Sequence, residues 1–137
     1  MLKKINIFIN KSNNIYMTIK LLKITKSDKP EKKFTAFFEI DKDNKKKGKI
    51  THFGFENPDD KTNDFTKHKD VERRNRYINR AKEQLAHGDP TRASYLSMFV
   101  LWNKPSFKDS VKDYNRRLNI YNKTGKFPIS DLINQAK

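Results

Sequence analysis

Four side chains near the middle of the chain have the residue types of an acid–base or metal site. They are His52, Asp64, His68 and Asp70. Two histidines with carboxylates can hold a divalent metal ion, and a histidine beside an aspartate can act as a general base. Their spacing matches no established metal motif, and an ordinary interpretation stays open in which Asp64 forms a turn and Asp70 caps a helix. We therefore predict no catalytic residue, metal or cofactor, and keep these four as the candidate set for a metal-dependent nuclease.

A second set of side chains has the chemistry of phosphate binding. Arg73, Arg76 and Arg80 are spaced by three and four residues, so they share one face of a helix. A guanidinium group can hold two phosphate oxygens at once, and few acidic residues stand nearby to neutralise these three. Lysines on a hairpin between two predicted strands would grip phosphate without reading sequence. The predicted nucleic-acid-binding residues are Lys67, Lys69, Arg73, Arg74, Arg76, Arg80, Lys45, Lys46 and Lys47.

The charge of the whole chain agrees with a polyanionic partner. Lys and Arg total 31 against 16 Asp and Glu among 137 residues, a formal net charge of +15. Nucleic acid is the commonest partner for such a surplus, although a lysine-rich surface can also serve solubility alone. The absence of cysteine excludes disulfides, thiol nucleophiles and cysteine-based zinc sites. No apolar run reaches the ~20 residues of a membrane span, and no signal-peptide core is present, so an intracellular or virion protein is expected.

The elements that must position these residues follow from hydrophobic periodicity. Residues 17–25, 33–41 and 49–56 alternate in the manner of strands and are joined by short polar links, which favours an antiparallel meander. Three helical segments follow. The first begins after Asp70 and ends near Gly88, and the second begins at Asp89–Pro90 and ends before Pro105.

The third helix has the clearest period, from a Ser106 cap to Gly125. Lys108, Lys112, Arg116 and Arg117 give it a further basic set. The prediction is an α+β fold with a three-stranded antiparallel β-meander followed by three α-helices. Residues 17–124 form the domain, 1–16 a loose arm or added edge strand, and 125–137 a tail with a short helix. Met17 is an alternative start to Met1.

Trp102 is the single tryptophan and ends the second helix. Apolar neighbours surround it in the sequence, so we expect a core or interface anchor rather than a platform for stacking bases.

A resemblance is carried by the pattern His-Phe-Gly, Asp-aromatic-Thr, His-x-Asp, an arginine-rich helix, Asp-Pro, and Leu-Trp-x-Lys-Pro-Ser. It is similar to a family of short basic proteins of giant nucleocytoplasmic large DNA viruses, over roughly residues 17–118. The resemblance implies no enzymatic activity for this chain, but it implies a virion or viral-factory location. Members often carry His and Gly where this chain has Ala81 and Ser94, which weakens a catalytic role. The matching positions are His52, Phe53, Gly54, Asp64, Phe65, Thr66, His68, Asp70, Arg73, Tyr77, Arg80, Asp89, Pro90, Leu101, Trp102, Lys104, Pro105 and Ser106.

These observations predict a non-enzymatic protein that binds nucleic acid, DNA being the expected form, through backbone phosphates and without sequence specificity. Genome packaging or organisation is the expected role, in the virion or the host-cell cytoplasm. The alternative is a structural virion or capsid-associated protein that binds an acidic viral partner through Trp102 and the third helix. A metal-dependent nuclease is the third hypothesis.

Overall fold

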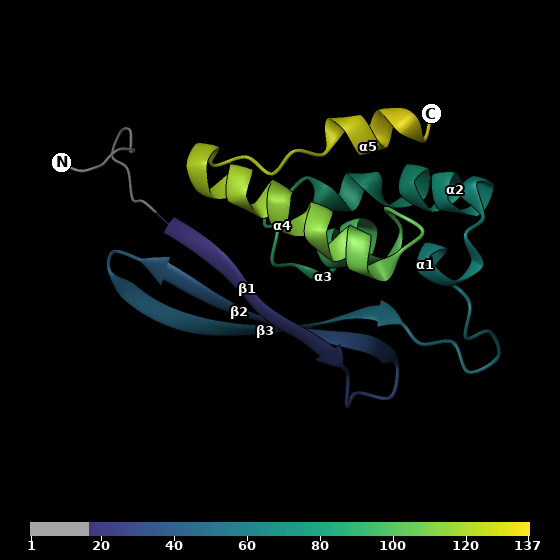
Figure 1. The fold of residues 1–137 in the computed structure, drawn as a ribbon, viewed down its shortest axis with the longest axis horizontal. Coiled ribbons are helices and arrows are strands. Elements are labelled where there is room, and N and C mark those ends of the chain that lie inside the picture. Colours follow the sequence, from purple (N-terminus) through teal and green to yellow (C-terminus); the bar gives the residue numbers. More distant parts are fainter. Residues whose placement is uncertain (1–16) are drawn as a thin grey trace.

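The computed structural model describes residues 17–137, so the predicted N-terminal arm falls outside the described residues. Figure 1 shows a three-stranded sheet with the helices lying over one of its faces. The strands β1 (Met17–Lys26), β2 (Lys32–Lys42) and β3 (Lys45–Phe55) are antiparallel in the order β1-β2-β3. The predicted α+β class and β-meander are therefore confirmed.

Alternation along the strands builds the sheet side of the core. Ala36 and Phe38 on β2 are buried, as are Ile19 on β1 and Phe53 on β3. Each large apolar side chain buried in this way contributes roughly 1.5–3 kcal/mol to stability. On the side of β1 away from β2, the Asn122 side chain accepts from the backbone N–H of Ile19 and donates to its carbonyl, both at 2.8 Å.

The turn between β2 and β3 differs from the prediction. Asp43 and Asn44 both have positive φ, 55° and 62°, and form a two-residue turn between the paired residues Lys42 and Lys45. Residues of this type tolerate the left-handed conformation that such hairpin turns require. Lys45, Lys46 and Lys47 were expected in a flexible loop, and that expectation is wrong, because they are paired residues at the start of β3.

The first predicted helix is present as α2 (Val71–Ala81), continued by the 3₁₀ helix η2 (Lys82–Leu85). Asp70 caps it as predicted, since its carboxylate accepts from the backbone N–H groups of Glu72 and Arg73. An additional short helix, α1 (Phe65–His68), precedes it.

The second helical region consists of α3 (Ala93–Leu96) and the π-helical segment η3 (Ser97–Leu101). It begins later than predicted. Asp89 accepts hydrogen bonds from both the N–H and the hydroxyl of Thr91, so it closes a turn instead of capping a helix. All of η3 after Ser97 is buried, in agreement with the apolar sequence of this segment.

The third predicted helix is α4 (Phe107–Thr124), capped by Ser106 and ended by Gly125 in the left-handed conformation, as the sequence predicts. It is followed by the short helix α5 (Ser130–Gln135). The short helix expected within the tail of residues 125–137 is present as α5, and this segment packs against the domain instead of lying apart from it. Phe127, Leu132 and Ala136 are buried in the same core as the sheet and helices.

Candidate nucleic-acid interface

The arginine face of α2, defined as Arg73, Arg76 and Arg80, lies at the surface. The side chains of Arg73 and Arg76 are 38% and 61% exposed, and Arg80 is also exposed. Arg73 lies 3.9 Å from a carboxylate oxygen of Asp60, and Arg76 lies 4.0 Å from one of Glu72. Exposed pairs at such distances are weak and screened by salt, so these guanidinium groups can exchange their partners for phosphate.

Arg74, which adjoins this face, has a different environment from the one predicted. It is buried, donates to the Trp102 carbonyl at 3.3 Å and to the Gln135 side chain at 2.9 Å, and lies over the Phe65 ring. Burial lowers the pKa of Arg74 below its ordinary value. A guanidinium held in this way joins α2 to the C-terminal segment, so Arg74 is removed from the predicted binding residues.

The two lysines near α1, Lys67 and Lys69, also differ in their environments. Lys67 is exposed. The Lys69 ammonium group donates to the carbonyls of Thr66 and Pro105, at 2.9 and 3.2 Å. Lys69 therefore connects α1 to the start of α4. The Lys67 ammonium group, by contrast, makes no hydrogen bond with any residue from 17 to 137.

The lysines at the start of β3 do not extend the arginine face. Lys45, Lys46 and Lys47 are exposed, and Lys46 lies 3.9 Å from Glu39. Figure 1 places the turn before them at the end of the sheet away from α2. The two predicted basic sets therefore form separate surfaces.

The candidate acid–base set is not assembled. His52 Nδ1 lies 2.8 Å from the Thr35 hydroxyl and 3.1 Å from the Ser27 hydroxyl, both on the sheet side of the molecule. Asp64 is buried in an ion pair with Lys33 and accepts from Thr66. Each residue thus has a separate structural partner.

His68 and Asp70 are likewise engaged locally. His68 Nδ1 accepts from the Asp70 N–H at 2.8 Å, while the Asp70 carboxylate caps α2. Burial lowers the pKa of His68, and the positive charge of Arg73 also lowers it. The negative charges of the nearby aspartates raise this pKa but do not offset the two. Within residues 17–137 no group of three or more His, Asp or Glu residues is arranged to hold a metal ion.

Trp102 is half-buried rather than fully enclosed. Its ring stacks on Tyr77 of α2, with centroids 4.3 Å apart and planes 6° from parallel, and the His68 ring lies 5.3 Å away. Burial raises the pKa of Tyr77, while a hydrogen bond with Ser97 and the charge of Arg80 act in the opposite direction. The aromatic pair therefore lies directly beside the arginine face.

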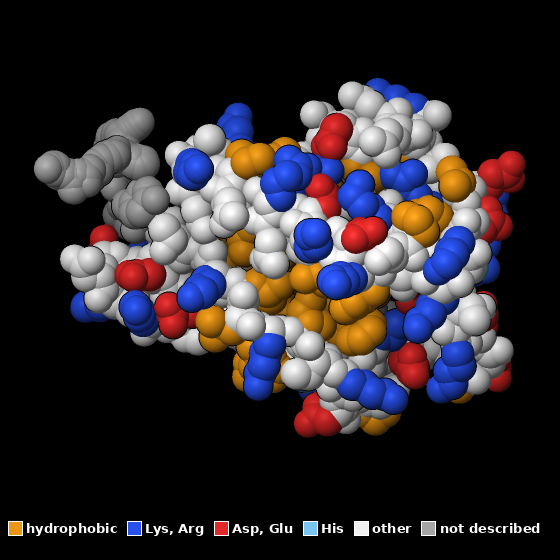
Figure 2. All heavy atoms as spheres, viewed as in Figure 1, with side chains coloured by type: hydrophobic (Ala, Val, Ile, Leu, Met, Phe, Trp, Pro, Cys, Tyr) orange, Lys and Arg blue, Asp and Glu red, His pale blue; other side chains and the backbone are white. Residues whose placement is uncertain are grey.

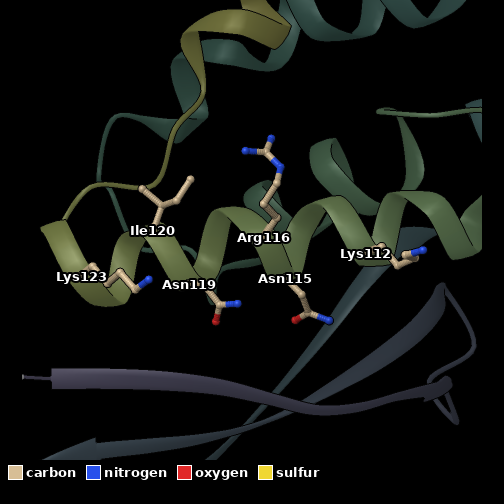
Figure 3. Close-up of a pocket in the computed structure, with 6 residues that line it drawn as sticks. All are labelled: Lys112, Asn115, Arg116, Asn119, Ile120 and Lys123. Atoms are coloured by element: carbon tan, nitrogen blue, oxygen red, sulfur yellow. The ribbon is translucent and has the colours of Figure 1, made fainter.

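A further basic surface was only partly anticipated from the sequence. The α4 stripe, defined as Lys112, Arg116, Asn119 and Lys123, repeats at intervals of four, three and four residues along the exposed side of α4. With Asn115 and Ile120 it borders a shallow hollow of about 500 Å³ (Figure 3). Figure 2 shows Lys and Arg side chains at intervals along this part of the surface. The helical spacing of these residues was the signal that could have identified the full stripe.

Arg117, expected among the basic residues of α4, is instead buried. Its guanidinium group donates to Asp113 at 2.7 Å, to Asp131 at 2.8 Å and to the Pro128 carbonyl at 2.7 Å, and lies over the Phe99 ring. Burial alone would lower the pKa of Arg117, but the hydrogen bonds to Asp131 and Asp113 raise it. Arg117 therefore fixes the C-terminal segment to α4.

Part of the chain is similar to a known family. The model of the "Family of unknown function (DUF5754)" matches residues 22–81, which run from β1 to the end of α2. The arginine face lies inside the matched segment, whereas Trp102 and the α4 stripe lie outside it. No curated protein and no solved structure matches the chain. In the described part of the chain, no helix combines the length and the apolar character that crossing a membrane requires.

Proposed function

We propose that this protein binds nucleic acid through its backbone phosphates and is not an enzyme. The observation that supports this most directly is the arginine face of α2. Arg76 and Arg80 are exposed and Arg73 is partly exposed, and the acidic partners of Arg73 and Arg76 lie at the limit of contact. Guanidinium groups spaced three and four residues apart on one helix can bind successive phosphates of a backbone.

The α4 stripe supports the same proposal from a second helix. Lys112 and Lys123 make no ion pair with any residue from 17 to 137, while Arg116 is held by Asp113 at 2.9 Å. Together with the net charge of +15, these groups favour binding driven by counterion release, with DNA as the expected ligand and no reading of base sequence.

The test is the dependence of duplex affinity on salt concentration. Each phosphate contact contributes about −0.9 to the slope of log K against log salt for duplex DNA. A double variant, Arg76→Gln with Arg80→Gln, should reduce the slope by about two and weaken binding to all sequences alike. The matched control is Lys20→Gln with Lys29→Gln, which removes the same charge from exposed positions on β1 and the following turn.

Two results would contradict the proposal. Absence of binding at low salt, or a slope near zero, excludes phosphate contacts altogether. An equal loss in the test and control pairs would show that total charge matters and the arginine face does not.

The resemblance to basic proteins of giant DNA viruses supports a setting in a virion or viral factory, with a role in genome packaging or organisation. A second candidate function uses the same setting. The α4 stripe mixes cations with Asn115, Asn119 and Ile120 around its hollow, a composition that also suits an acidic protein segment. Cross-linking within intact virions separates the two, since contacts to capsid proteins without contacts to the genome favour the structural role.

A further inference from the structure

A second hollow lies beside the arginine face, between the end of β3 and the helices. It measures about 360 Å³, close to the lower limit for ligand pockets in proteins. The stacked rings of Tyr77 and Trp102 are part of its lining, and the exposed Phe55 also borders it. Amide and hydroxyl groups supply part of the polar lining, and Lys32 adds an ammonium group. The amides and hydroxyls come from Asn63, Gln84, Ser94 and Ser97.

One buried polar atom in this lining has no hydrogen-bond partner among residues 17–137. Asn63 donates from Nδ2 to the Phe55 carbonyl at 3.1 Å, but its Oδ1 is buried and accepts no hydrogen bond from residues 17–137. A buried acceptor left unsatisfied destabilises the protein, and an N–H donor that reached Asn63 Oδ1 would relieve that cost. The hollow therefore combines aromatic side chains with amide groups, a combination that suits a planar heterocycle carrying N–H groups.

The charges next to the hollow indicate what such a ring would be attached to. Arg73, Tyr77, Arg80 and Gln84 follow one another at intervals of four, three and four residues along α2 and η2. They therefore share one face, on which Tyr77 and Gln84 line the hollow and the two arginines flank Tyr77. A ring bound against Tyr77 and Trp102 would have guanidinium groups on both sides of it along the helix.

We propose that the hollow receives one unstacked base of a single-stranded nucleic acid, while Arg73 and Arg80 bind the phosphates on either side. The volume suits a single base, and the bases of a duplex are paired and stacked, so they cannot enter. This inference rests on the proposed function and adds to it a preference for single strands.

Trp102 makes the proposal directly testable, because it is the only tryptophan in the chain and lies in the lining. Its fluorescence is measured while the full chain is titrated with three probes at the same salt concentration. These are a short single strand of mixed sequence, a strand of equal length with abasic residues throughout, and a duplex. The single strand should quench Trp102 fluorescence and bind about 5- to 140-fold more tightly than the abasic strand, which is the range for stacking of one base.

A variant that fills the hollow tests whether the preference for the single strand arises there. Ser94→Leu places a larger apolar side chain in the lining, and Ser130→Leu makes the same change at an exposed position on α5. Ser94→Leu should remove the preference for the single strand while leaving abasic binding unchanged, and Ser130→Leu should change neither. Thermal unfolding followed by circular dichroism verifies that both variants fold.

The outcomes separate this inference from the proposed function. Equal affinity for the three probes with unchanged Trp102 fluorescence overturns the base-binding hollow and leaves phosphate binding intact. A preference for the single strand that survives in folded Ser94→Leu also overturns the assignment to this hollow. Failure of every probe to bind at low salt overturns both proposals.

Discussion

The buried network around Arg117 gives a quantitative prediction about acid stability. The Arg117 side chain is 3% exposed and lies between Asp113, 9% exposed, and Asp131, 53% exposed. Burial alone would raise the pKa of Asp113, but hydrogen bonds from Arg117, Asn103 and Arg116 outweigh it and lower the pKa from 3.8 to about 2. At 1.36 kcal/mol per pKa unit, ionised Asp113 contributes about 2 kcal/mol to folding near neutral pH.

The sign of the pH dependence follows from the lowered pKa. A carboxylate that is more acidic in the folded chain than in the unfolded chain stabilises the fold above its unfolded pKa. That contribution is lost as the pH falls from about 4 to about 2. Asp113→Asn removes the charge and leaves the buried guanidinium with one carboxylate, so we expect a loss of about 3 kcal/mol near neutral pH.

Urea denaturation of wild type and variant, at several pH values between about 7 and 2.5, measures this directly. The free-energy gap between the two proteins should narrow as the pH falls below about 4, because wild-type Asp113 then becomes neutral as well. Asp131→Asn is the control. Its carboxylate is half-exposed, so its loss should cost at most about 1 kcal/mol. A gap that stays constant down to the lowest pH, or a larger cost for Asp131→Asn, would refute the reasoning.

Three further predictions concern stability. Gly54 has a φ of 83°, and an added Cβ would lie 2.8 Å from Leu101 Cδ1, so Gly54→Ala should cost about 2–4 kcal/mol in chemical denaturation. Gly88→Ala, at a similar φ in open space, should cost only about 1 kcal/mol, and equal costs would argue against the steric explanation. Tyr114→Phe removes a buried 2.7 Å hydrogen bond to the Pro90 carbonyl and should lower the free energy of unfolding by about 1–3 kcal/mol in the same assay. An unchanged free energy of unfolding would contradict this prediction. Ser106→Ala removes the cap of α4 and should cost about 1 kcal/mol, with faster hydrogen exchange at the Asp109 amide; unchanged exchange would mean that the cap is dispensable.

The parts of the fold that the sequence predicts are those decided by local rules. The caps at Asp70 and Ser106 and the left-handed end at Gly125 depend on side chains within a few residues of the helix end. The turn at Asp43–Asn44 also obeys a local rule, but the lysine-rich sequence after it resembles a loop. Pairing of that segment with β2 decides its structure, and pairing is a property of the sheet.

The candidate site was predictable only in part, because burial of a charged residue depends on distant partners. Arg73 and Arg74 are neighbours of the same type, yet Arg73 is partly exposed while Arg74 is buried and donates to Trp102 and Gln135. No local pattern distinguishes them. The hollow beside Tyr77 could not be predicted from the sequence for the same reason. Its lining comes from β2, β3, the loop before α1, α2, η2, α3 and η3.

The contact between Asn122 and Ile19 has a consequence for how copies of this chain behave at high concentration. The outer edge of a sheet offers unpaired backbone groups to which a strand from another molecule can add, a common first step of aggregation. Asn122 occupies both backbone groups of Ile19 on the β1 edge. The opposite edge strand begins with Lys45, Lys46 and Lys47, whose like charges repel the same edge of a second copy. Each edge of the sheet thus carries a feature that opposes strand addition, an amide at Ile19 and like charges at the start of β3.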